Sequence, residues 1–90
     1  MDYHLANRHQ ESVRTVFRAT GLVADIERAR KAVARLEGKI VLVRDKSANN
    51  RLLLGEIVRY EHNKHLYGLR EIVSKNITSL NFQNLSEIYI

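Results

Sequence analysis

The densest group of side chains suited to binding occupies residues 60–65, Tyr-Glu-His-Asn-Lys-His. Tyrosine and histidine rings can stack on nucleic-acid bases, lysine can contact phosphate, and asparagine offers both a hydrogen-bond donor and an acceptor. Turns attract Asn, Lys and His without any binding role, so a solvated turn is the alternative interpretation. The binding interpretation assigns contacts with nucleic acid to Tyr60, His62, Asn63, Lys64 and His65.

A second basic feature lies in the first half of the chain. Arg28, Lys31 and Arg35 are spaced by three and four residues, which places them on one helix face over a length of about 10 Å. Such a row can follow a phosphate backbone. It can equally be the solvated face opposite an apolar stripe, and both interpretations stay open.

No pattern of residues predicts an enzyme or a metal site. His62 and His65 with Glu61 fall short of a complete set of metal ligands, and the chain has no cysteine. It also lacks a phosphate-binding glycine loop, a nucleophile elbow and paired carboxylates. We therefore expect no catalytic residue, no metal and no cofactor.

Composition indicates a small basic domain. The chain has 90 residues and a formal net charge of +5, from 15 basic and 10 acidic residues, which favours a polyanionic partner. No stretch approaches the roughly 18 consecutive apolar residues that a membrane span requires, and the start lacks the order of a signal peptide. We expect a single cytoplasmic domain with no membrane partner.

Residues 1–37 are predicted to be helical. From about Asn7 to Ala19, the spacing of Val13, Val16 and Phe17 suits one face of a helix. A second, stronger helix is predicted after Thr20, a good N-cap residue. Its apolar stripe steps by four, three, four and three residues through Leu22, Ile26, Ala29, Val33 and Leu36. Gly38 suits the left-handed position that closes a helix.

Residues 38–90 change to a period of two, which predicts strands over 39–44, 52–60, 66–73, 77–82 and 85–90. Gly55 and Gly68 lie inside two of these strands, where glycine permits a sharp bend. Closing so small a sheet removes its exposed edges. The expected fold is α+β, mainly β: a strongly bent, five-stranded SH3-like barrel whose open end is covered by the helix.

The order of elements from about Leu22 to Ile90 resembles the Sm-like family, which includes Hfq. Gly55, Tyr60, Glu61 and His65 stand where the first motif of that family has glycine, phenylalanine, aspartate and asparagine. Residues 80–88, Leu-Asn-Phe-Gln-Asn-Leu-Ser-Glu-Ile, fit the frame of the second motif without its Arg-Gly pair.

The resemblance implies a homo-oligomeric ring that binds single-stranded RNA, closed by pairing between the edge strands of neighbouring subunits. At the positions where Sm-like proteins hold a base, this chain has Asn63, His65 and Asn81. The first two belong to the polar segment described above, and the resemblance adds Asn81 to the candidate RNA contacts.

Two other interpretations remain. Tudor-like barrels show nearly the same strand rhythm, so the chain can be a protein-interaction module, of a host-binding phage or plasmid type, with no nucleic-acid ligand. Arg14-Thr-Val-Phe-Arg18 and Asp45-Lys-Ser47 are similar to the two short motifs of PilZ domains, which implies a cyclic di-GMP ligand. Asn50 stands where the second of those motifs has glycine.

Overall fold

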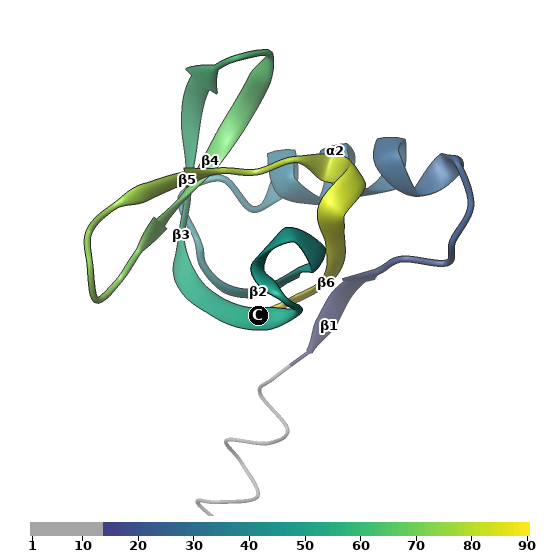
Figure 1. Ribbon diagram of the computed structural model, residues 1–90, viewed down its shortest axis with the longest axis horizontal. Coiled ribbons are helices and arrows are strands. Elements are labelled where there is room, and N and C mark those ends of the chain that lie inside the picture. Colours follow the sequence, from purple (N-terminus) through teal and green to yellow (C-terminus); the bar gives the residue numbers. More distant parts are fainter. Residues whose placement is uncertain (1–13) are drawn as a thin grey trace, which may run out of the picture.

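A computed structural model describes residues 14–90 of the protein as one antiparallel sheet with one α-helix (Figure 1). Along the chain the elements are β1 (Thr15–Arg18), α2 (Ala24–Arg35), β2 (Ile40–Asp45), η1 (Lys46–Ala48), β3 (Arg51–His62), β4 (His65–Glu71), β5 (Ile77–Ser79), η2 (Phe82–Asn84) and β6 (Leu85–Tyr89). The six strands lie in the order β1-β6-β2-β3-β4-β5. The expected class, mainly β with helix, is confirmed at this level.

The long strand β3 pairs with two neighbouring strands. Its first half pairs with β2, its second half pairs with β4, and the change occurs around Gly55 and Glu56, each of which has a partner on both sides. A Cβ atom on Gly55 would lie 2.5 Å from the carbonyl oxygen of Arg70. No side chain fits there, so glycine is required for the close approach of β3 and β4. The curvature of β3 is visible in Figure 1.

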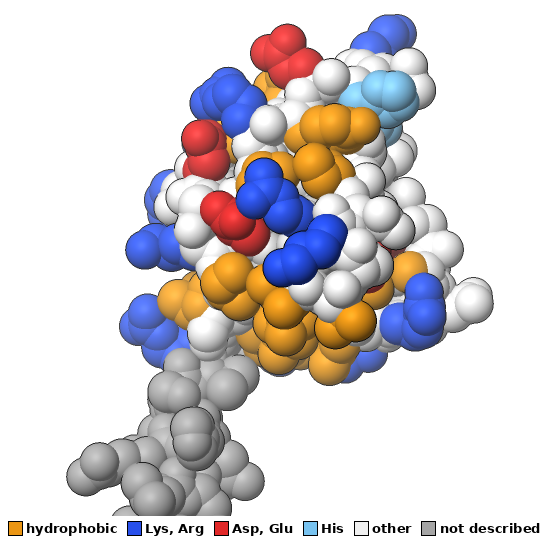
Figure 2. All heavy atoms as spheres, turned by 90° about the vertical axis from the view of Figure 1, so that its left-hand side faces the viewer, with side chains coloured by type: hydrophobic (Ala, Val, Ile, Leu, Met, Phe, Trp, Pro, Cys, Tyr) orange, Lys and Arg blue, Asp and Glu red, His pale blue; other side chains and the backbone are white. Residues whose placement is uncertain are grey.

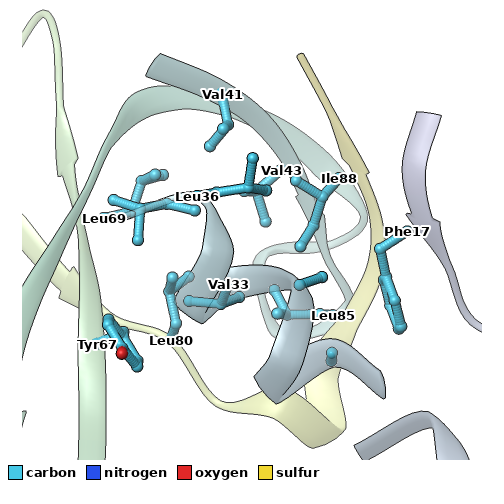
Figure 3. Packing of buried hydrophobic residues seen from close by; sticks show 13 residues of the cluster. Phe17, Val33, Leu36, Val41, Val43, Tyr67, Leu69, Leu80, Leu85 and Ile88 are labelled. Atoms are coloured by element: carbon cyan, nitrogen blue, oxygen red, sulfur yellow. The ribbon is translucent and has the colours of Figure 1, made fainter. Parts of the chain in front are cut away.

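The core lies between the concave side of the sheet and α2 (Figure 3). Alternate residues of the strands point inward, as a pleated sheet dictates, and meet one face of the helix. The buried apolar residues are Phe17, Ala29, Ala32, Val33, Leu36, Val41, Val43, Ile57, Tyr67, Leu69, Leu80, Leu85 and Ile88.

The helix predicted for residues 7–19 is wrong where the structure describes it, because Thr15–Arg18 forms strand β1. β1 pairs with β6, and Arg14 exchanges two backbone hydrogen bonds of 2.8 and 2.9 Å with Ile90. Thr, Val and Phe favour strands, and pairing with the distant end of the chain outweighs the local helical spacing. Residues 7–13 lie outside the described part.

The second predicted helix is confirmed over Ala24–Arg35, but its apolar stripe is buried only in part. Ala29, Val33 and Leu36 lie in the core, whereas Leu22 and Ile26 are 69% and 38% exposed. Burial of the helix therefore begins at Ala29, and the residues before it remain exposed to solvent in part. Gly38 has φ +85°, as its predicted role at the end of the helix requires.

The five strands predicted after Gly38 are present, and three of them end earlier than predicted; β6 ends at Tyr89 rather than Ile90. β4 ends at Glu71 rather than Val73, and β5 ends at Ser79, so that Phe82 lies in η2. The sheet has six strands because β1 adds to β6. Within residues 14–90 its two edge strands, β1 and β5, are not paired with each other. The only described α-helix has twelve residues and is too short and polar to cross a membrane.

Candidate nucleic-acid interface

The polar segment 60–65 forms the exposed end of the β3–β4 hairpin. His62 and His65 are cross-strand partners, and the two residues between them have positive φ angles, 47° for Asn63 and 69° for Lys64. Two consecutive left-handed residues form the type I′ turn that fits the twist of a two-stranded ribbon. Asparagine tolerates this conformation well, so the local sequence accounts for a turn at this place. The predicted tip is therefore confirmed as a turn.

Two aromatic rings of β3 lie together beside this turn. The centroids of the Tyr60 and His62 rings are 5.7 Å apart, with 27° between the ring planes. The Nδ2 atom of Asn63 lies 3.2 Å from Nε2 of His62, which fixes the outer ring. His62 is exposed and Tyr60 is half-buried. The pair offers an exposed ring face beside a lysine, as a stacking site for a base requires.

Asn81 lies away from the turn. Its side chain caps η2, where the Oδ1 atom accepts a hydrogen bond of 3.0 Å from the backbone N–H of Gln83. The preceding residue, Leu80, donates its backbone N–H to the carbonyl oxygen of Tyr67, in the middle of β4. The structure thus places Asn63 and His65 at the turn, and gives Asn81 a structural role beside the hairpin.

Arg28, the first of the three predicted helix residues, is held by contacts within the chain. Its guanidinium donates to Oδ1 of Asp25 at 2.8 Å and to the carbonyl oxygen of Arg18 at 3.3 Å. Its Cζ atom also lies 5.2 Å from the centre of the Phe17 ring. Arg28 therefore joins β1 to the start of α2, and its charge is largely compensated there.

Lys31 and Arg35, which we call the basic row, are not held by such contacts as those of Arg28. Both are exposed, and neither forms an ion pair with another residue of 14–90. They line a groove of about 170 Å³ between α2 and β1, together with Arg28, Val16, Phe17 and Ala32. The predicted stripe is thus a continuous surface feature, with two of its three cations available to an anion.

The C-terminal end of α2 adjoins the base of the hairpin. Gly38 donates its backbone N–H to the carbonyl oxygen of Ile57 at 2.7 Å, and Glu37 pairs with Arg59 at 3.3 Å. The guanidinium of Arg59 also lies over the Tyr67 ring, 5.3 Å from its centre. Sequence reasoning missed Arg59, whose signal was its position next to Tyr60 on a predicted strand.

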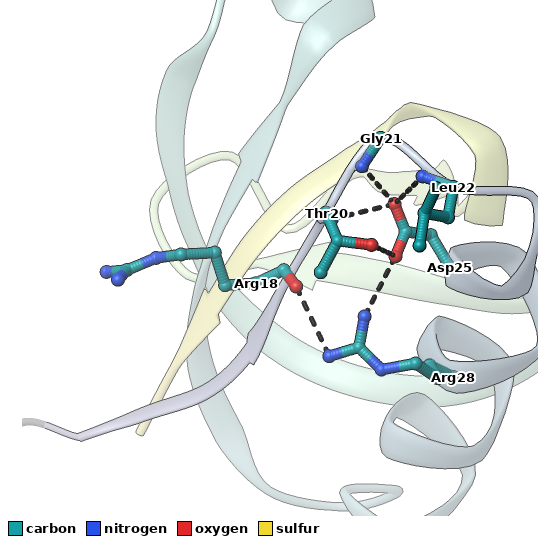
Figure 4. A network of polar contacts seen from close by, with 6 residues as sticks. All are labelled: Arg18, Thr20, Gly21, Leu22, Asp25 and Arg28. Carbon is teal, nitrogen blue, oxygen red and sulfur yellow. Dashed lines mark hydrogen bonds and ion pairs between the residues drawn. The ribbon is translucent and has the colours of Figure 1, made fainter.

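The carboxylate of Asp25 organises the connection between β1 and α2 (Figure 4). It accepts hydrogen bonds from the Thr20 hydroxyl at 2.7 Å and from the backbone N–H groups of Thr20, Gly21 and Leu22 at 2.8, 2.7 and 3.2 Å. These bonds, led by that from the Thr20 side chain, lower the pKa of Asp25 to about 2. Thr20 was predicted as the helix N-cap; it instead donates to a residue inside the helix.

The residues of the PilZ-like motifs have structural partners. Arg18 and Arg44 flank Glu87 at 3.1 and 2.9 Å, and the Tyr89 hydroxyl together with these arginines lowers the pKa of Glu87. Asp45 is buried and accepts hydrogen bonds from the backbone N–H and hydroxyl of Ser47, at 2.8 and 2.7 Å. The helix α2 separates the two motifs.

Among residues 14–90, no three His, Asp or Glu side chains lie close enough together to hold a metal ion. Comparisons with protein-family models, curated proteins and solved structures find no match for this chain.

Proposed function

We propose that the chain is an Sm-like barrel that binds single-stranded RNA along α2 and the β3–β4 hairpin. The barrel part of this proposal is supported by the strand order, because β6 returns to lie beside β2 and β3 bends around Gly55. A sheet that rolls up on itself needs both features. The helix then covers the concave side, as Figure 3 shows.

The observation that carries the RNA proposal is that the exposed basic row lies on the helix whose C-terminal end contacts the base of the hairpin. Lys31 and Arg35 are free of ion pairs within the described residues, and the contact between Glu37 and Arg59 joins their helix to the hairpin. The helical row from Arg28 to Arg35 spans about 10 Å, and the strand from Arg59 to His62 adds about 10 Å. Cations thus lead to an exposed aromatic pair.

Each part of this surface suits a different part of a nucleotide. The basic row attracts phosphates, and the gain comes largely from released counterions. The Tyr60–His62 pair stacks with an unpaired base, and the Asn63 amide is placed beside it to meet a base edge. Duplex RNA hides its base faces, so a single strand is the expected ligand.

The proposal includes self-association. The edge strands are β1 and β5, so a ring closed by strand pairing needs β5 of one subunit to meet β1 of the next. Arg28 already uses the carbonyl oxygen of Arg18 on β1, and β5 has only three residues. Both edges therefore offer little backbone for pairing, so contacts between side chains of neighbouring subunits must contribute to self-association.

Replacement of both rings, Tyr60→Ala with His62→Ala, tests the stacking site. Loss of one stacked base costs about 1–3 kcal/mol, so affinity for a short single-stranded RNA should fall between about 5-fold and 150-fold. The dependence of affinity on salt should stay unchanged, because no phosphate contact is lost. Fluorescence anisotropy with a labelled RNA measures both. Unchanged affinity would remove the turn from the site.

A protein-interaction module is the second candidate, favoured by the convex side of the sheet. Ile40, Leu52 and Leu54 are 52%, 46% and 46% exposed there, and Leu42 is the cross-strand partner of Leu54. Figure 2 shows apolar side chains gathered along the lower edge of the molecule, away from the histidines at the top. If the chain binds no RNA at low salt, the protein-interaction module becomes the favoured function.

A further inference from the structure

The first turn of α2 borders an apolar hollow of about 250 Å³. Its wall is formed by Leu22, Val23 and Ile26, and by Phe82 and Leu85 from the far end of the chain. Lys46 stands at the same hollow, exposed and without an ion pair in the described part of the chain. Asp25 also borders the hollow, but its negative charge is offset by the ion pair with Arg28 at 2.8 Å (Figure 4).

This hollow is the uncovered continuation of the core. The apolar stripe of α2 runs from Leu22 to Leu36, but the sheet covers it only from Ala29 onward. Leu22, Val23 and Ile26 are therefore 69%, 88% and 38% exposed. Burial of such side chains is favourable, so the exposed half favours a contact that residues 14–90 of the same chain do not supply.

The turn between β4 and β5 presents apolar side chains to solvent. Val73, at 94%, is the most exposed of the large apolar residues described, and its neighbour Ile72 is 38% exposed. Turns usually carry polar residues, so two branched aliphatic side chains at this place are unexpected. The turn is held in shape by hydrogen bonds of 2.9 Å from Lys75 N–H to Glu71 C=O and from Glu71 N–H to Asn76 C=O.

We propose that Ile72 and Val73 of one copy of the chain insert into the hollow beside Leu22 of a second copy. In Figure 1 the β4–β5 turn projects from the left side of the molecule, whereas the first turn of α2 and η2 lie on the right. The two surfaces can therefore be used at the same time by different neighbours. Glu71, next to Ile72, supplies a carboxylate for Lys46 at the hollow.

A contact between two different surfaces is heterologous, so each subunit offers one free turn and one free hollow. Repetition gives a ring if the rotation closes and a chain of subunits if it does not. Association between subunits depends on protein concentration by mass action. This inference deepens the self-association part of the proposed function and is independent of RNA binding.

The test uses sedimentation equilibrium of the full chain without RNA, over a range of protein concentrations. Wild type should exceed the monomer mass of 10.4 kDa as concentration rises, whereas Val73→Asp and Leu22→Asp should each remain at 10.4 kDa. An equal mixture of the two variants should regain mass up to two chains and no further. Each variant retains the surface that the other has lost, so a single productive contact is possible.

Controls separate this contact from other ways of self-association. Ser74→Asp places the same charge in the same turn, and Leu54→Asp places it on the convex face of the sheet; both should associate like wild type. Circular dichroism confirms that each variant is folded, and Val23→Asp provides a second change at the hollow.

Three results would overturn the inference. If Val73→Asp still associates while Leu54→Asp does not, the interface is the convex face. If the two single variants fail to complement each other, the contact is not heterologous. If wild type is a monomer at every concentration, this contact and the proposed self-association are both wrong. The RNA proposal is tested separately, by the titration with labelled RNA.

Discussion

The apolar stripe of α2 is buried at the C-terminal end of the helix and exposed at the N-terminal end. At the C-terminal end, Val33 and Leu36 are 0% and 7% exposed, and the chain continues directly into hydrogen bonds with β3. At the N-terminal end, Leu22 and Val23 are 69% and 88% exposed. Apolar packing stabilises the C-terminal end of the helix, and hydrogen bonds to the Asp25 carboxylate stabilise the N-terminal end. Helical periodicity therefore indicates which face is apolar, but not how far the partner sheet extends along it.

Because of this difference, substitution of leucine by alanine should lower the free energy of unfolding by unequal amounts at the two ends of the helix. Leu36→Ala should lower the free energy of unfolding by about 2–5 kcal/mol, because it leaves a cavity beneath the sheet. Leu22→Ala is the matched control at the other end and should change stability by less than about 0.5 kcal/mol. Urea denaturation measures both. Equal losses would show that the first turn of α2 is also part of the core.

The packed end also depends on the bend in β3. Gly55→Ala places a Cβ atom 2.5 Å from the Arg70 carbonyl oxygen and 2.8 Å from the Leu69 side chain, so the backbones of β3 and β4 must separate. We expect a loss of about 1–3 kcal/mol, as for an overpacked core. Gly21→Ala is a contrasting change at the polar end, where a Cβ meets nothing within 4 Å and the strain comes from φ alone. Unaltered stability of Gly55→Ala would contradict the close approach of the strands.

Acid should weaken the hydrogen-bonded connection between β1 and α2, because this connection depends on the charged Asp25 carboxylate. The pKa of Asp25 is about 2 in the folded chain, below its ordinary value of 3.8, so the charged carboxylate stabilises the fold. This contribution is complete above about pH 4 and is lost as the pH falls to about 2. The stability difference between wild type and Asp25→Asn should therefore be largest near neutrality and shrink toward pH 2. A difference that is constant over this range would mean that the charge has no role.

Local patterns accounted for much of the fold, and distant contacts for the rest. The central helix, the β3–β4 hairpin and the turn at residues 63–64 follow from spacing and turn chemistry within a few residues. β1 was missed because its partner is remote: Arg18 pairs with Glu87, 69 positions along the chain. Its apolar residues fit a helix as well as a strand, and only pairing with β6 decides between them.

The candidate site divides in the same way. Exposure of Lys31 and Arg35 could be predicted, since they lie opposite an apolar stripe. The attachment of Arg28 to Asp25 and to the Arg18 carbonyl could not, because the latter depends on where β1 lies. The same holds for Asn81, whose capping role follows from the position of η2. Residues that bind nucleic acid and residues that hold the fold share the same chemical types, and three-dimensional neighbours distinguish them.

The salt dependence of RNA affinity tests the proposed function most directly, using one pair of matched variants. Lys31→Ala with Arg35→Ala removes the basic row, and Arg51→Ala with Lys75→Ala removes one lysine and one arginine that are exposed elsewhere. Between about 50 and 200 mM salt, the first pair should lower the slope of log affinity against log salt by about 1–2 relative to wild type. The second pair should retain the wild-type slope. Equal slopes for the two pairs, or no RNA binding by wild type at low salt, would contradict the proposal.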